Sequence, residues 1–74
     1  MVAMNIGSTI ERIRISKGMA YAAAAKATGV PTTTLFNIES GARSPKLEML
    51  EKIASGLGMK TSALIKAAEA EESK

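Results

Sequence analysis

The sequence predicts an all-α fold, a compact bundle of five short helices. Three observations lead to this prediction. Apolar residues recur three or four positions apart, β-branched residues never alternate with polar ones over the length of a strand, and a glycine follows each of the first four apolar stripes. A chain of 74 residues makes one domain that buries only about 60% of its unfolded surface, so its stability margin is thin.

The first two helices are predicted before residue 29. Ile6, Ile10 and Ile13 stand at i, i+4 and i+7 and so share one helix face, and Gly18 ends this helix. The second helix covers about residues 20–28, where a run of four alanines supplies the strongest helix formers. It is followed by a glycine, which can take a positive φ at a sharp turn.

The third helix begins at Pro31, because proline is tolerated in a first turn whose N–H has no partner within the helix. Leu35 and Ile38 form its apolar stripe, and Gly41 ends it. Three threonines follow the proline, and any of them could cap the helix: Thr32, Thr33 and Thr34.

Two more helices complete the bundle. The fourth has an apolar stripe made of Leu47, Leu50, Ile53, Ala54 and Leu57. The fifth begins near Thr61, and its apolar residues are Leu64, Ile65 and Ala68. The sequence therefore predicts one domain over residues 1–66 and an acidic tail over residues 67–74, which is either the end of the fifth helix or disordered.

The second and third helices have the spacing of a helix-turn-helix. Such helices must cross at roughly 90–120°, so the residue at the crossing must be small and the turn must be flexible. Ala25 meets the first requirement and Gly29 meets the second. With Leu35 and Ile38 in the core, the other face of the third helix is free to enter a major groove, which is wide enough for one helix.

The composition excludes several kinds of site. The chain has no cysteine and no histidine, which excludes a zinc finger and every His-based catalytic arrangement. It has no glycine-rich phosphate loop either, so we expect no enzymatic activity, no metal and no cofactor. No apolar run approaches the ~20 residues of a membrane span, and residues 1–5 do not read as a signal peptide, so we expect a cytoplasmic protein with no membrane partner.

The formal charge of +3 is unevenly distributed. Residues 1–68 hold nine basic and four acidic residues, whereas residues 69–74 hold one lysine and three glutamates. A basic body with an acidic tail is compatible with a polyanionic partner such as nucleic acid. Tyr21 and Phe36 are the only aromatic residues, which argues against an RNA-binding sheet with several stacking rings.

Three short motifs stand at defined spacings in the chain: Thr-Gly-Val at 28–30, Ile-Glu-Ser-Gly at 38–41 and Leu-Glu-Met-Leu-Glu-Lys-Ile-Ala at 47–54. Single residues accompany them: Ile6, Gly7, Ile10, Arg14, Gly18, Ala25, Leu35, Pro45, Leu57, Gly58 and Leu64. In this combination residues 6–66 resemble the lambda-repressor/Cro type of helix-turn-helix domain, also called the xenobiotic-response-element type. The resemblance implies five helices and DNA binding, mostly as a dimer on two half-sites.

The resemblance also implies which residues contact DNA. The exposed face of the third helix is expected to read bases through Thr32, Thr33, Phe36 and Asn37. Asparagine can pair bidentately with adenine, and threonine offers a hydroxyl and a methyl group. The loop that follows is expected to contact phosphates through Arg43, Ser44 and Lys46. The alternatives are that the threonines cap the helix, that the asparagine is plain surface and that the loop charges are only solvated.

Two positions depart from the pattern of the family. The second helix usually starts with Ser or Asn followed by Gln, whereas this chain has Ala20 and Tyr21. Loss of the side-chain cap typically costs about 1 kcal/mol. The backbone N–H groups there can still hold a phosphate, and the Tyr21 hydroxyl is a candidate replacement contact. Ala24 stands where a larger apolar residue is usual, which shrinks the core and favours dimerisation as a source of stability.

Three further assignments follow from the resemblance. Arg14 and Glu39 match a pair that forms a structural salt bridge between the first and third helices. Phe36 stands where the family has a small or polar residue, and three roles are open for it: contact with a thymine methyl group, a dimer contact, or packing onto the edge of the core. The dimer surface is expected on the fifth helix, at Leu64, Ile65 and Ala68.

We interpret the sequence as a small transcriptional regulator that binds double-stranded DNA as a homodimer, with half-sites ~34–36 Å apart. A phage repressor or Cro-like protein, a restriction–modification controller and an antitoxin all fit, in a bacterial or phage-encoded, nucleoid-associated setting, and no small-molecule effector is expected. The alternative is a protein–protein interaction module that keeps the fold without binding DNA. Phe36 and the uncapped second helix favour the alternative, whereas the basic body and the polar face of the third helix oppose it.

Overall fold

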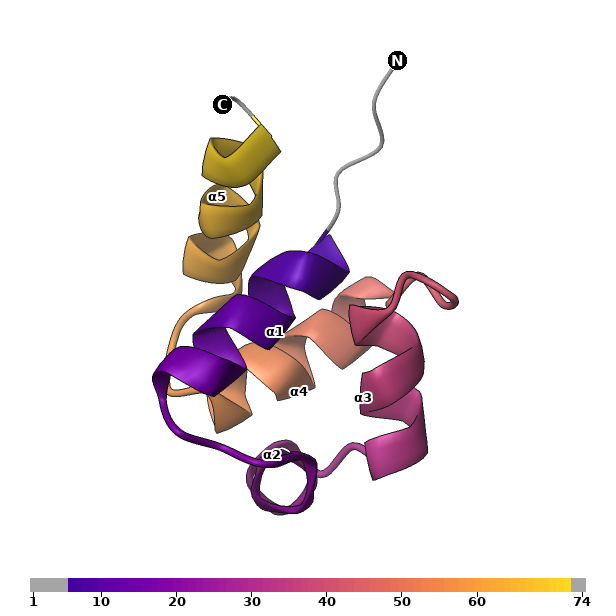
Figure 1. Cartoon of the computed structure of the whole chain (residues 1–74). Helices are drawn as coiled ribbons and strands as arrows, with labels where there is room; N and C mark the ends of the chain where they lie inside the picture. The colour runs from indigo at the N-terminus through magenta and orange to yellow at the C-terminus, as the bar shows by residue number, and fades with distance from the viewer. Residues whose placement is uncertain (1–5, 73–74) are drawn as a thin grey trace.

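Five helices make up the described part of the chain, residues 6–72 of the computed structural model, and no strand occurs within these residues (Figure 1). In chain order they are α1 (Ile6–Ser16), α2 (Tyr21–Thr28), α3 (Thr32–Glu39), α4 (Leu47–Gly56) and α5 (Thr61–Glu72). The predicted all-α five-helix class is therefore confirmed. Within the described range, each helix is too short or too polar to cross a bilayer. The expectations for residues 1–5 and 73–74 lie outside this range.

The helix ends differ in one respect from the sequence-based expectation. Pro31 is the N-cap of α3 rather than its first residue, and no side chain caps the helix. The alternative in which Thr32, Thr33 or Thr34 caps α3 is therefore not what the structure shows. Because the cap position is taken by proline, the threonines fall inside the first turn, where Thr32 and Thr33 stay exposed. Their hydroxyl groups remain available for a partner outside the chain.

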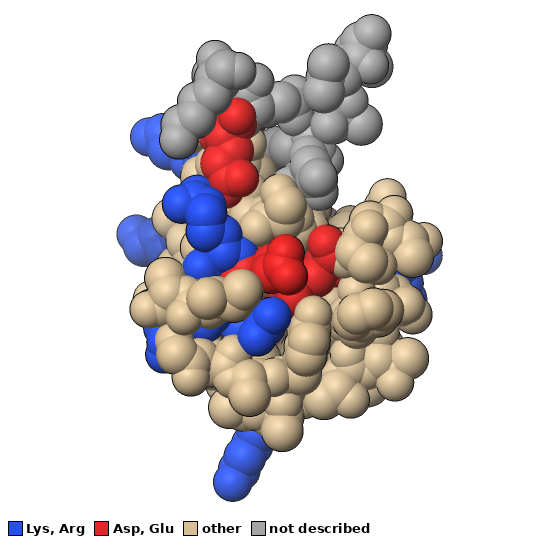
Figure 2. Space-filling model, viewed as in Figure 1, with Lys and Arg blue, Asp and Glu red and all other residues tan. Residues whose placement is uncertain are grey.

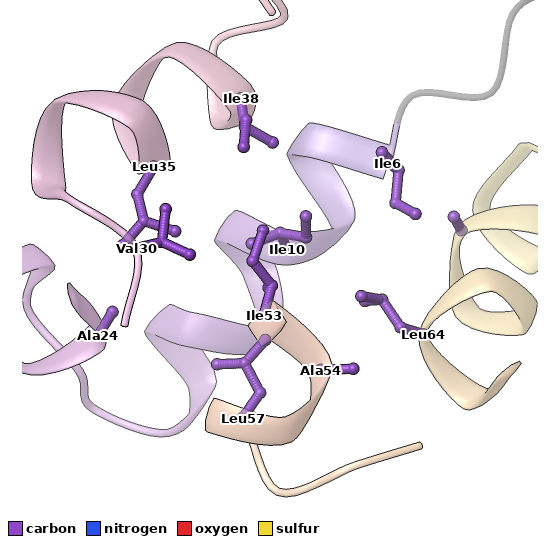
Figure 3. Packing of buried hydrophobic residues seen from close by; sticks show 11 residues of the cluster. Ile6, Ile10, Ala24, Val30, Leu35, Ile38, Ile53, Ala54, Leu57 and Leu64 are labelled. Atoms are coloured by element: carbon purple, nitrogen blue, oxygen red, sulfur yellow. The ribbon is translucent and has the colours of Figure 1, made fainter. Parts of the chain in front are cut away.

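The core is a single cluster to which all five helices contribute (Figure 3). α1 packs on α3 and α5, and α4 packs on α2 and α5, so the elements enclose one interior. Ile10 of α1, Ile53 of α4 and Leu64 of α5 are each 1% exposed or less. The members of the core cluster are Ile6, Ile10, Ala24, Val30, Leu35, Ile38, Ile53, Ala54, Leu57, Leu64 and Ala68.

Leu47 is a correction to the predicted apolar stripe of α4. Its side chain is 62% exposed, whereas Ile53 and Ala54 further along the same helix are fully buried. Leu47 is the first residue of α4, and helical side chains lean toward the N-terminus of their helix. Because it stands at the start of the helix, its side chain leans toward the preceding loop instead of the core.

Two helical glycines allow close packing that the apolar pattern did not reveal. A Cβ on Gly7 of α1 would overlap the backbone carbonyl oxygen of Ile38 at the end of α3. A Cβ on Gly56 of α4 would come within 2.6 Å of the Cα of Thr28 at the end of α2. Both helices of the helix-turn-helix are thus held by helices that approach them at backbone distance.

α5 runs through the described part of the predicted acidic tail, residues 67–72. Its far end is tied to α1 by an ion pair in which Arg12 Nε donates to Glu71 Oε2 at 3.0 Å. The arginine side chain is 62% exposed, so solvent screens this pair and it adds little to stability. The tail is therefore a helical continuation of the domain as far as residue 72.

Replacing Thr9 by valine is expected to stabilise the protein by about 1 kcal/mol. Thr9 is 0% exposed, and its Oγ1 has no hydrogen-bond partner among the described residues. Valine has nearly the same shape without the buried hydroxyl, so the desolvation penalty is removed and no cavity forms. Urea unfolding of the two proteins measures the difference, and a lower midpoint for the variant would contradict this account.

Candidate nucleic-acid interface

α2 and α3 are separate helices joined by the turn 29–31, and in Figure 1 α2 is seen end-on while α3 runs across the view, so the two cross steeply. Gly29 has φ 77°, and its N–H donates to Ala25 O at 2.8 Å, which closes α2. Thr28 Oγ1 donates to Ala24 O at 2.8 Å and accepts from Val30 N at 3.1 Å. The turn is thereby fixed by hydrogen bonds on both sides of the glycine.

Two alanines of α2 occupy packed positions. Ala25, the residue expected at the crossing, is partly buried against the core, whereas Ala24 is only 1% exposed and belongs to the core itself. The small side chain at 24 fits the close approach of α4, whose Gly56 lies against Thr28 one turn along α2. The small side chain at position 24 therefore lies where α4 packs closely against α2.

The expected base-reading residues lie on the side of α3 that faces away from the core. Leu35 and Ile38 are 1% exposed and hold the inner face. The outer face carries no charged side chain, and Figure 2 shows the surface where α3 lies in Figure 1 as largely uncharged. Thr32, Thr33 and Phe36 are exposed and Asn37 is half-buried. The structure thus brings all four together on one accessible face.

The loop after α3 presents the expected phosphate-contacting residues. Arg43, Ser44 and Lys46 are exposed, and the backbone N–H of Arg43 donates to Asn37 O at 3.1 Å, which ties the loop to the end of α3. A hollow of about 220 Å³ opens here at the start of α4, whose N-cap Lys46 provides no side-chain cap. Its lining is Arg43, Ser44, Pro45, Lys46, Glu48, Met49 and Lys52.

Lys52 is a further basic residue of this hollow, and it was not among the residues expected to contact phosphate. It lies in the middle of α4, outside the loop 42–46 that holds the expected residues. Helical periodicity could have found it, because residues 48 and 52 are four positions apart and share a helix face. Three basic side chains and one glutamate therefore meet around the N-terminus of α4, where the helix dipole also favours an anion.

A buried ion pair fixes α3 against α1. Arg14 Nε donates to Glu39 Oε2 at 2.8 Å and Arg14 Nη2 donates to Glu39 Oε1 at 3.2 Å, while Arg14 Nη1 donates to Met19 O at 2.7 Å. Arg14 and Glu39 are both only 7% exposed. The hydrogen bond to Glu39 raises the pKa of Arg14 further above its already high value. The ion pair that the resemblance implied is therefore present, and it links α1 to the end of α3.

Tyr21 joins this buried pair. Its hydroxyl donates to Glu39 Oε1 at 2.9 Å, and the Arg14 guanidinium carbon lies 4.1 Å from the centre of its ring. The hydroxyl has one hydrogen, and a phosphate oxygen can only accept. The predicted contact between Tyr21 and a phosphate would therefore require the hydroxyl to leave Glu39.

The absorbance change that accompanies ionisation of Tyr21 is expected to have its midpoint above pH 10.0, because the hydrogen bond to Glu39 raises the pKa of this phenol. The chain has one tyrosine, so no other phenol contributes. Stability from this bond is present below pH 10.0 and is lost as the pH rises through the folded-state pKa. Glu39→Gln should move the midpoint back toward 10.0, and a wild-type midpoint at or below 10.0 would speak against the bond.

The expected dimer surface on α5 needs a correction. Leu64 is 0% and Ala68 is 2% exposed, because both belong to the core of the single chain. They are not available to a second copy, so their assignment to a dimer interface is wrong. Ile65 is half-buried, and it lines an open hollow of about 470 Å³ together with Ser62, Ala63, Lys66 and Glu69.

Comparison with known protein families matches residues 10–64 to the helix-turn-helix family HTH_3. An uncharacterized HTH-type transcriptional regulator of Mycobacterium tuberculosis H37Rv is 40% identical over 53 residues, which are 72% of this chain and 21% of that protein. The chain therefore spans about a fifth of the length of the curated relatives it matches.

Solved structures resemble the whole domain. An HTH_3 family transcriptional regulator from Vibrio cholerae superposes with a TM-score of 0.80 at 38% identity, over 85% of this chain and 35% of that one. The wild-type restriction–modification controller protein C.Esp1396I superposes with a TM-score of 0.86 at 25% identity, over 96% of this chain and 91% of that one. The five-helix arrangement is thus shared with regulators of this type.

Proposed function

The chain belongs to the helix-turn-helix family HTH_3, and from this premise we propose that it binds a specific sequence of double-stranded DNA through the outer face of α3. The observation that carries the proposal is the division of α3 into two faces. Leu35 and Ile38 are buried, whereas the opposite face gathers Thr32, Thr33 and Asn37 around an exposed ring. These hydroxyl and amide groups can pair with base edges in the major groove, which distinguishes all four base pairs.

Phosphate contacts would come from two places beside α3. Arg43, Ser44 and Lys46 surround the hollow at the start of α4, together with Lys52. The first N–H groups of α2 meet no side-chain cap at Ala20, which leaves them able to hold a phosphate. Contacts from these two places beside α3 would set the register of α3 on the duplex.

Dimeric binding is part of the proposal. Two copies would place their α3 helices in successive major grooves, ~34–36 Å apart. With Leu64 and Ala68 committed to the core, Ile65 is the one of the three expected residues that still reaches the surface, where it lines the hollow on α5. The match to C.Esp1396I over 91% of that controller protein supports a regulator of the restriction–modification controller kind. The proposed place of action is the cytoplasm.

Selection of bound sequences from a random duplex pool, with the mass of the complex measured alongside, tests the proposal. We expect one enriched sequence with two related half-sites and a complex of two chains per duplex. Enrichment of a single half-site with one chain would refute the dimer but keep the DNA-binding function. Absence of any enriched sequence would refute sequence-specific DNA binding and favour a protein-interaction module.

Asn37→Ala is expected to relax the preference at one base position of the selected site and to weaken binding there by ~1–3 kcal/mol. The amide would lose its paired contact with a base edge, while the buried face of α3 stays unchanged. Binding to the selected duplex and to single-base variants measures both effects. Ser55→Ala on α4 is the control, because Ser55 is exposed and lines neither hollow, and equal behaviour of the two variants would exclude base reading by Asn37.

A further inference from the structure

We propose that Phe36 reads the C5-methyl group of a thymine in the major groove, and that Tyr21 is the positioning residue that holds the Phe36 ring for this contact. The inference rests on the proposed function, because it names what one residue of the recognition face recognises. Three observations support it: the exposure of the Phe36 ring, the contact between the Phe36 and Tyr21 rings, and the chemistry of the residues around Phe36 on α3.

Phe36 lies in the middle of the outer face of α3. Residues three and four positions apart are neighbours on a helix, so Thr32, Thr33 and Ser40 surround it, and all three are exposed and uncharged. Phe36 is 55% exposed, so it is not part of the buried core and much of its ring remains accessible to a partner. The face is therefore an apolar centre within a ring of hydroxyl groups.

The inner side of the Phe36 ring rests on Tyr21. The two ring centres are 6.1 Å apart with an angle of 68° between the planes, an edge-to-face arrangement that aromatic pairs prefer. The position of the Tyr21 side chain is fixed, because its hydroxyl donates a hydrogen bond to Glu39 and its ring lies against the Arg14 guanidinium. The orientation of Phe36 is thus restricted before any partner arrives, which lowers the entropic cost of binding.

The partner follows from what a base edge can offer an apolar ring. Major-groove edges carry hydrogen-bond donors and acceptors, and the methyl group of thymine is their apolar feature. A phenyl ring pressed against the polar groups would leave them without partners, which is unfavourable. The sequence of α3, Thr-Thr-Thr-Leu-Phe-Asn-Ile-Glu, also lacks the Arg or Lys that pairs with guanine. A thymine is therefore the base that fits Phe36.

Single substitutions of thymine by uracil in the selected duplex test the inference, because uracil pairs with adenine as thymine does and lacks only the methyl group. The wild-type chain is expected to lose about fourfold in affinity at one position of each half-site, the value of one buried methyl-sized group. Phe36→Ala should bind the thymine and uracil duplexes equally at that position. Asn37→Ala, on the same face, should keep the wild-type ratio.

Two Tyr21 variants separate positioning from simple structural support. Tyr21→Phe keeps the ring against Phe36 and should keep most of the thymine-to-uracil ratio, whereas Tyr21→Ala should lower that ratio toward one. The ratio compares two duplexes on the same folded protein, so a general loss of stability does not change it. A wild-type ratio near one at every thymine, with Asn37→Ala still relaxing one position, would overturn this inference alone. Absence of any selected duplex would overturn it together with the proposed function.

A role of Phe36 in a contact between copies is a separate outcome of the same experiment. In that case Phe36→Ala would change the number of chains per duplex and leave the thymine-to-uracil ratio of the remaining complex as in the wild type. This result would overturn the methyl-reading role.

Discussion

Glu39→Ala is expected to lower the free energy of unfolding by about 3–5 kcal/mol, the usual cost of removing one partner from a buried ion pair. The substitution leaves the Arg14 guanidinium buried without its carboxylate and leaves the Tyr21 hydroxyl without its acceptor. A domain of this size has a total stability of only about 4–11 kcal/mol. Glu39→Ala should therefore remove a large share of the total stability.

Chemical denaturation of wild type and variant measures this loss. Glu51→Ala is the matched control, because Glu51 is an exposed glutamate on α4 and its loss should change stability by less than about 0.5 kcal/mol. Glu39→Gln should fall between the two, since it keeps hydrogen-bonding atoms but not the charge. If Glu39→Ala behaved like the control, the buried pair would not be what holds α3 in place.

Leu64→Ala is expected to cost about 2–5 kcal/mol, because it removes a large side chain from the centre of a close-packed core. Figure 3 shows Leu64 directed from α5 into the buried cluster, and the residue is 0% exposed. The loss should be the same at every protein concentration, since it arises within one chain. The neighbouring Ile65→Ala is the control, because Ile65 is only half-buried and borders the open hollow on α5.

Leu64→Ala and Ile65→Ala together distinguish a residue of the core from a residue of a dimer interface. Ile65→Ala should cost less in unfolding free energy, and under the dimer proposal it should lower the mass of the complex or its dependence on concentration. The measurements are thermal unfolding at several protein concentrations and the mass of the particle in solution. A loss for Leu64→Ala that disappears at high protein concentration would restore that residue to a dimer interface.

Helical periodicity was sufficient to predict most of the fold. Ile10, Leu35 and Ile38 are buried where their spacing placed them, and Gly29 has the positive φ expected of the turn. Leu47 was wrong because periodicity assigns a helix face but does not say where the core ends along that face. Gly7 was quoted as part of the family pattern, yet its reason, an approach of α1 to the backbone of α3, is a tertiary contact that no local pattern contains.

The sequence predicted the exposed residues of the candidate site better than the residues whose role depends on contacts between helices. The outer face of α3 and the loop 42–46 are exposed as expected. Once Leu35 and Ile38 are assigned to the core, the opposite face of the helix must lie at the surface. The partners of Tyr21 come from α1 and α3, seven and eighteen positions away, and their meeting depends on how three helices cross. Leu64 and Ala68 were assigned to an interface because an apolar stripe on a terminal helix does not say whether it covers its own domain or another chain.

The salt dependence of binding to a random-sequence duplex tests the central claim most directly. If a dimer places Arg43, Lys46 and Lys52 of each chain near phosphates, affinity should fall by about 10³-fold between ~50 and ~200 mM salt, because each neutralised phosphate releases counterions. A protein-interaction module has no reason to bind the duplex even at the lowest salt. Absence of binding there, or an affinity that does not change with salt, would contradict the assignment of this chain as a DNA-binding regulator.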